Sequence, residues 1–223
     1  MQPHIPFVPA WQTRSTPAYT NWWETYSPKA GRVVRLFGNL TYYLWIWIES
    51  CPTWETLCEH PKPKSDASHP ASALNASLWA KDRTGQEVFF WTKYTDQQKV
   101  REDPAEVHGD SFALAEAQYP TIGRAVALDR LLLAQPHFIS NWTLILRFVS
   151  SSRRSAPTDL EMRIVRCVRT RGSLTIKQIE AEFAPLSESD IRTAVFCALY
   201  SGQLRADLNN ITLNTATLLY HAS

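Results

Sequence analysis

Two short segments on either side of a tight turn constrain the fold of this chain most. The sequences ASLWAKD and QEVFFWTKY are rich in aromatic and apolar residues, and only Arg-Thr-Gly lies between them. Strand-like runs separated by so short a turn containing glycine predict a β-hairpin. Strand alternation would place Phe89, Trp91 and Lys93 on one face of the second strand. The fold must therefore include at least this antiparallel strand pair.

Helical and extended patterns surround this hairpin. Apolar residues at helical spacing precede Cys51-Pro52, where a helix is expected to end. Helices mixed with strands in this order predict an α/β domain. The pattern predicts an extended arm over 1–21, a helix over 41–49, a loop over 61–73, a helix over 110–118, a strand over 123–128 and a helical stretch over 129–149.

The pattern changes after SSSRRSAPT, residues 150–158, which we interpret as a linker into a second domain. Apolar stripes beyond it predict three helices, of which the second opens at Ser173-Leu-Thr175 and the third is capped by Ser187. The run RADLNNITLN then predicts a hairpin that turns at Asn209-Asn210. Three helices followed by a strand pair predict a winged helix-turn-helix. The expected organisation is an arm over 1–21, an α/β domain over 22–152 and a winged-helix domain over 153–223.

Composition excludes several classes of protein. The formal net charge is only +2, so charge alone does not indicate a nucleic-acid-binding protein. The four cysteines show no CxxC spacing, which argues against a metal cluster. No apolar run of about 18 residues appears, so we expect a cytoplasmic protein with no membrane partner.

A long phrase near the N-terminus carries a family resemblance. SPKAGRVVRLFGNLTYYLWIWIESCPTWETLCEHP, residues 27–61, resembles the opening of TnsA, the endonuclease subunit of heteromeric transposases. With the C-terminal winged helix, the resemblance covers residues 22–223 and rests on an ordered set of weak motifs. The matching residues are Lys29, Gly31, Arg32, Val33, Val34, Glu49, Pro52, Glu59 and Pro61.

The resemblance implies a restriction-endonuclease-like N-terminal domain in a bacterial cytoplasmic protein that acts at the nucleoid. It also implies two protein partners, a transposase subunit and an AAA+ transposition regulator, and we expect DNA as a third partner. In that family a glutamate on the first helix, an aspartate that begins a hairpin strand, and an acid or glutamine two residues before a lysine form the site. The acids hold Mg²⁺, which activates a water.

Residue-by-residue placement leaves this site without its acids. Thr41 takes the helix position, Ser77 the hairpin position and Trp91 the third position, while Lys93 is retained. Because Mg²⁺ is normally bound through at least one or two carboxylates, we expect no metal and no cofactor, and Lys93 would be limited to a phosphate contact. Mg²⁺ would be needed only if the site were active.

Three functions remain open on the sequence. The first is a TnsA-like subunit of a transposition complex that binds its partners through an inactive nuclease domain. The second is an active Mg²⁺-dependent endonuclease that cleaves the non-transferred strand, with a site that lies one residue away from this placement or is rebuilt from Asp66, Asp82 or Asp96. The third is a DNA-binding regulator in which the winged helix does the work.

Basic residues are the candidate DNA contacts. The third predicted helix should expose Arg192 and Phe196 beside acids. A single arginine next to acidic residues argues against strong recognition of base edges. Arginines three residues apart on the first predicted helix share a side and are suited to phosphates, although a solvated helix surface looks the same. The full candidate set is Arg32, Arg35, Arg163, Arg166, Arg169 and Arg192.

Overall fold

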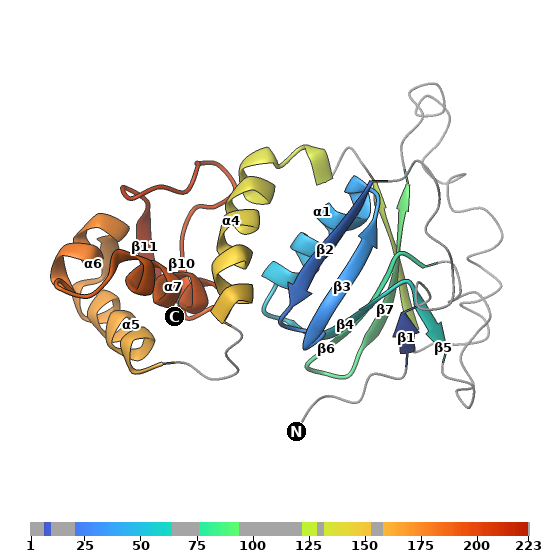
Figure 1. Ribbon diagram of the computed structural model, residues 1–223, viewed down its shortest axis with the longest axis horizontal. Coiled ribbons are helices and arrows are strands. Elements are labelled where there is room, and N and C mark those ends of the chain that lie inside the picture. The colour runs from blue at the N-terminus through green and yellow to red at the C-terminus, as the bar shows by residue number, and fades with distance from the viewer. Residues whose placement is uncertain are drawn as a thin grey trace. The chain divides into compact units, whose positions relative to one another are not determined.

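The computed structural model describes residues 7–9, 21–63, 76–93, 122–128, 132–152 and 158–222. Contacts divide the chain into two compact units, which Figure 1 traces. The first unit comprises Met1–Glu49 with Thr53–Ala134, and the second comprises Ser50–Pro52 with Gln135–Ser223. Within the described ranges, no helix has the length and apolar character that crossing a bilayer requires.

The first unit is built on a mixed four-stranded sheet. Its strand order is β4-β6-β7-β8, in which β4, β6 and β7 pair antiparallel and β8 runs parallel to β7. Two further strand pairs, β2–β3 and β1–β5, are antiparallel. The elements are β1 (Phe7–Pro9), β2 (Trp22–Ser27), β3 (Arg32–Phe37), α1 (Asn39–Ser50), β4 (Trp54–Glu59), β5 (Pro61–Pro63), β6 (Leu78–Asp82), β7 (Glu87–Lys93) and β8 (Ile122–Leu128).

Several local predictions are confirmed in this unit. The β6–β7 hairpin forms, with Leu78 opposite Phe90. The helix predicted over 41–49 is α1, and the strand predicted over 123–128 is β8. The helix predicted over 110–118 lies outside the described residues.

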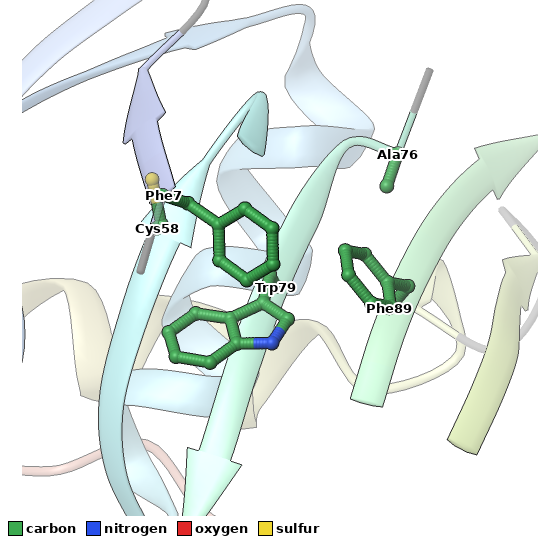
Figure 2. Close-up of a cluster of buried hydrophobic side chains, with 5 residues drawn as sticks. All are labelled: Phe7, Cys58, Ala76, Trp79 and Phe89. Atoms are coloured by element: carbon green, nitrogen blue, oxygen red, sulfur yellow. The ribbon is translucent and has the colours of Figure 1, made fainter. Parts of the chain in front are cut away.

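The predicted N-terminal arm is wrong at residues 7–9, which belong to the core. Figure 2 shows the ring of Phe7 beside Trp79 and Phe89, and the centroid distances are 4.9 Å and 5.5 Å. The backbone of β1 pairs with β5, so the loop predicted over 61–73 also begins as a strand. Residues Phe7, Cys58, Ala76, Trp79 and Phe89 form this aromatic cluster. One aromatic residue among prolines has no periodicity, which is why the sequence pattern did not indicate its burial.

The β2–β3 hairpin is fastened to α1 at both ends of the helix. Near the start, Trp23 stacks on Tyr42 at 4.2 Å and its indole N–H donates to Asn39 Oδ1. Near the end, the fully buried Glu49 accepts from Ser27 Oγ at 2.9 Å and from the Lys29 N–H at 3.1 Å. Burial raises the pKa of the Glu49 carboxyl, because water is excluded from its charged form. The hairpin is therefore a fixed part of the unit.

The second unit contains four helices and a small antiparallel sheet in its described residues. Its strand order is β10-β11-β9. Thr158 caps α5, and Thr175 forms a reciprocal capping box with Gln178 at the start of α6. The elements are α4 (Pro136–Ser152), α5 (Asp159–Arg171), β9 (Ser173–Thr175), α6 (Ile176–Glu182), α7 (Glu188–Tyr200), β10 (Leu204–Arg205) and β11 (Leu218–His221).

The three predicted helices are confirmed as α5, α6 and α7, with two corrections. Ser173–Thr175, predicted to open the second helix, forms the strand β9, and only its last residue, Thr175, opens α6 as the N-cap. Ser187 occupies the N-cap position of α7, but its side chain makes no capping hydrogen bond. The boundary between the units lies at 134/135 instead of the expected 152/153, because α4 belongs to the second unit. The first three residues of the predicted linker, 150–152, continue this helix. Since Phe148 of α4 meets Phe196 of α7 edge to face at 5.0 Å, α4 belongs to the second unit.

The hairpin predicted over 205–214 is the largest correction in this unit. Only Leu204–Arg205 forms β10, which pairs with β11 at Leu218–His221. The connection 206–217 instead folds around Asn141 of α4, whose side chain is buried. Its amide donates to the carbonyls of Leu208 and Ile211 at 2.9 and 2.7 Å and accepts from the Leu213 N–H at 2.8 Å. These backbone groups therefore need no strand partner.

Candidate functional site

Three hydroxyl side chains meet where α1 approaches the start of β6 and the end of β7. Ser77 Oγ lies 3.0 Å from Thr92 Oγ1, and Thr41 Oγ1 lies 3.5 Å from the same oxygen. Thr41 is buried, while Ser77 and Thr92 are partly exposed. We call Thr41, Ser77 and Thr92 the hydroxyl cluster.

The backbone before β6 explains how Ser77 reaches this position. The Ser77 N–H donates to the Phe90 carbonyl at 2.8 Å, and the Ser77 carbonyl accepts from the His60 N–H at 3.0 Å. The side-chain Oγ then accepts from the Thr92 N–H at 3.1 Å, as a strand carbonyl would. Ser77 is a bend residue outside the regular strand, so its side chain need not follow strand alternation.

The structure brings together two of the predicted site residues and separates a third. Thr41 and Ser77 each lie within hydrogen-bond distance of the Thr92 hydroxyl. Trp91 does not join them, because it packs against the aromatic cluster, 6.3 Å from the Phe89 ring. Thr92 takes its place, since neighbouring residues of a strand face opposite sides and an error of one residue exchanges the faces. Lys93 is the last residue of β7, opposite Leu128 of β8.

The described residues of the site do not fit Mg²⁺. The hydroxyl cluster offers three neutral oxygens and no carboxylate, whereas Mg²⁺ is normally held by one or two carboxylates. Across the described ranges, no group of three or more His, Cys, Asp or Glu side chains is placed to hold a metal ion. We therefore derive no metal-dependent step from this arrangement.

The acids considered as substitutes do not change this conclusion within the described residues. Asp82 Oδ1 accepts from the N–H and hydroxyl of Thr84 and from the Gln86 N–H, at 2.7–2.8 Å. These hydrogen bonds, first the one from the Thr84 hydroxyl, lower the pKa of the Asp82 carboxyl and fix the β6–β7 turn. Asp66 and Asp96 lie outside the described residues.

Arg32, a predicted DNA contact, forms a buried ion pair. Its two terminal nitrogens donate to the two oxygens of Glu59, each at 2.6 Å, and Glu59 is fully buried. Burial alone would lower the pKa of the Arg32 guanidinium, but the hydrogen bond and charge of Glu59 outweigh it and raise the pKa. The bidentate fork is thus occupied inside the unit. Arg35 is more exposed, pairs with Glu24 at 3.3 Å and lies over the Trp22 ring.

The surface of α7 differs from the prediction. Phe196, expected to be exposed, is only 3% exposed because α4 covers it. Arg192 pairs with Glu180 at 2.6 Å and with Glu188 at 2.9 Å. The hydrogen bond to Glu180 raises the pKa of the Arg192 guanidinium. Of the α7 residues expected to face DNA, Phe196 is therefore covered by α4 and Arg192 is paired with two glutamates.

The arginines of α5 are placed differently. Arg163 lies over the Phe183 ring at 5.3 Å and 3.9 Å from Asp159, with its side chain 57% exposed. Arg166 and Arg169 are exposed, and they form no ion pair with any residue that the structure describes. The other four predicted DNA contacts, Arg32, Arg35, Arg163 and Arg192, each form an ion pair within the chain.

Comparison with known proteins adds no assignment. Neither the family models nor the curated proteins include a match to this chain. The case for a function therefore rests on the residues themselves. Two residues that sequence reasoning missed, Thr92 and Asn141, are central to the hydroxyl cluster and to the α4 contact.

Proposed function

We propose that this chain is a TnsA-like subunit of a DNA transposition complex whose nuclease-like domain binds without cutting. Its partners are a transposase subunit, an AAA+ regulator and transposon-end DNA, met at the bacterial nucleoid. The hydroxyl cluster supports this proposal, because two of its residues, Thr41 and Ser77, stand in the sequence where the resemblance calls for metal-binding acids, and the cluster contains no carboxylate. In this proposal the acids are lost and the nuclease-like fold is retained, so that binding is the remaining role.

The arrangement of the first unit supports a restriction-endonuclease-like domain. The resemblance implies a site made by a helix position, a residue that begins one hairpin strand and the residue two before a lysine on the next strand, where Trp91 stands and its neighbour Thr92 takes part instead. Thr41 lies on α1, Ser77 immediately before β6 and Thr92 near the end of β7, and the Thr92 hydroxyl lies 3.5 Å from that of Thr41 and 3.0 Å from that of Ser77. This convergence involves residues up to 51 positions apart, so local sequence does not impose it.

The element order of the second unit supports a winged helix. Helix α5, strand β9, helices α6 and α7, and strands β10 and β11 follow one another, and the three strands form one sheet. The three helices are the predicted ones, whereas the terminal strand pair lies at Leu204–Arg205 and Leu218–His221 rather than within 205–214, and β9 is added. The additional contacts of α4 with α7 and with the connection 206–217 favour a fixed structural module over an independent DNA-reading regulator.

Assembly without metal tests the proposal. The full chain should bind the transposase and labelled transposon-end DNA with a dissociation constant that changes less than about twofold between Mg²⁺ and EDTA, because the hydroxyl cluster, in the part of the chain that the structure describes, offers a metal no carboxylate. Ser77→Ala, which removes one hydroxyl, should assemble equally well. Electrophoretic mobility and light scattering would measure this. A loss of assembly in EDTA of about tenfold or more would contradict a metal-free scaffold.

A further inference from the structure

We propose that the second unit meets DNA through the exposed side of α5, by phosphate contacts alone, and not through α7 and the connection 206–217. This inference rests on the proposed function, since it assumes that DNA is a partner. It assigns the DNA-facing role to the first of the three C-terminal helices, where the predicted winged helix would have used the third.

Helix α4 already packs against α7 and the connection 206–217, the elements that a winged helix would use to meet DNA. Phe148 covers Phe196 of α7, and α4 buries further side chains along the same side. Asn141 also holds three backbone groups of the connection 206–217. A side chain that a second helix covers does not reach base edges in the major groove, so the Phe196 side of α7 is not available to DNA.

The charge of α7 argues the same way. Its first turn carries Glu188 and Asp190, and its one arginine is held by Glu180 and Glu188. The Asp190 carboxylate would repel DNA phosphates, and a phosphate that bound Arg192 would have to displace both Glu180 and Glu188. Even with α4 removed, this surface offers no unpaired cation among the residues of α7.

Helix α5 provides what α7 lacks. Arg163, Arg166 and Arg169 recur at three-residue spacing on its exposed side, where Asp159 is the acid, since Glu161 is buried. The run from Arg163 to Arg169 covers about 9 Å at about 1.5 Å per residue. One DNA strand presents a phosphate every 3.4 Å or so of axis, so this run spans two or three phosphates.

The expected binding is independent of base sequence. Arginine side chains on a helix that lies along the backbone reach phosphate oxygens, which carry no sequence information. Each phosphate contact releases counterions, so each contributes about 0.9 to the slope of log K against log salt concentration. If α5 makes these contacts, removing its arginines should lower the slope of log K against log salt concentration by the same amount on any duplex.

The test compares the full chain with Arg166→Ala/Arg169→Ala on two unrelated 30-base-pair duplexes, by fluorescence anisotropy from about 50 to 300 mM salt. The double variant should bind about tenfold or more weakly at the lowest salt, with a slope smaller by about 1.8, on both duplexes. Arg147→Ala, which removes an exposed arginine from α4, is the matched control for net charge. It should change the slope by less than half as much per arginine removed.

The outcomes separate this inference from the proposed function. If the full chain binds both duplexes and the double variant binds as well as the parent, the α5 assignment is wrong while DNA remains a partner. If Arg147→Ala has the same effect per arginine, only net charge matters and the assignment is again wrong. If the full chain binds neither duplex at about 50 mM salt, both the inference and the DNA-binding part of the proposed function are wrong.

Discussion

Replacing Arg32 with alanine is expected to lower the free energy of unfolding of the first unit by about 3–5 kcal/mol. The change leaves the Glu59 carboxylate fully buried without the guanidinium that now binds both of its oxygens at 2.6 Å. A lone buried carboxylate is costly, because neither water nor a counter-charge stabilises it. Urea unfolding followed by tryptophan fluorescence would measure the loss, since eight of the nine tryptophans, at 11, 22, 23, 45, 47, 54, 79 and 91, lie in the first unit.

Arg35→Ala is the matched control for this experiment. Arg35 comes from the same strand, and its pair with Glu24 is exposed on both sides, at 41% and 42%. Exposed ion pairs contribute about 0–1 kcal/mol, so this variant should unfold close to the parent. Equal and small losses for both variants would mean that Arg32 is not a structural residue, and its earlier assignment as a DNA contact would regain support.

Asn141→Ala is expected to destabilise the second unit by about 3 kcal/mol or more. Two buried backbone groups, at Leu208 and Leu213, and one partly buried carbonyl, at Ile211, would each lose a hydrogen-bond partner. Each buried polar group left unpaired costs about 1–3 kcal/mol. Far-ultraviolet circular dichroism during urea unfolding is suitable, because the described part of this unit is largely helical.

Thr143→Ala provides the comparison on the same helix. The Thr143 hydroxyl bonds only the Ile139 carbonyl one turn earlier, so its removal should cost less than about 0.5 kcal/mol. If Asn141→Ala were as mild as Thr143→Ala, the connection 206–217 would not depend on α4. The connection 206–217 would then be free of α4 and could meet DNA.

Elements with strong local patterns could be predicted from the sequence. The β6–β7 hairpin followed from two strand-like runs around a short turn, and α1 followed from its apolar spacing. The helices α5 to α7 followed for the same reason. In each case residues close in the chain decide the structure.

Features set by distant contacts could not be predicted. Thr92 replaced Trp91 at the site because the chain bends at Ser77, and regular alternation gives no sign of that bend. Phe196 lies on a side of α7 that becomes buried only when α4 packs there. Phe7 is buried by residues more than 50 positions away in the chain.

The same reasoning explains the site. Thr41 and Ser77 could be assigned because the resemblance fixed their positions in order along the chain. Their partner required the spatial arrangement of three elements. Arg32 was predicted to face DNA because its charge is visible in the sequence, whereas its pairing with Glu59 depends on how β3 approaches β4.

The most direct measurement of the central claim is strand cleavage on labelled transposon-end DNA with the cognate transposase present, in Mg²⁺ and then in Mn²⁺. The full chain and Lys93→Ala would be assayed side by side, with complex formation followed in the same samples. The account predicts that both proteins join the complex and that neither nicks the DNA. Nicking by the full chain that Lys93→Ala abolishes would contradict it, and would mean that acids outside the described residues complete an active metal site.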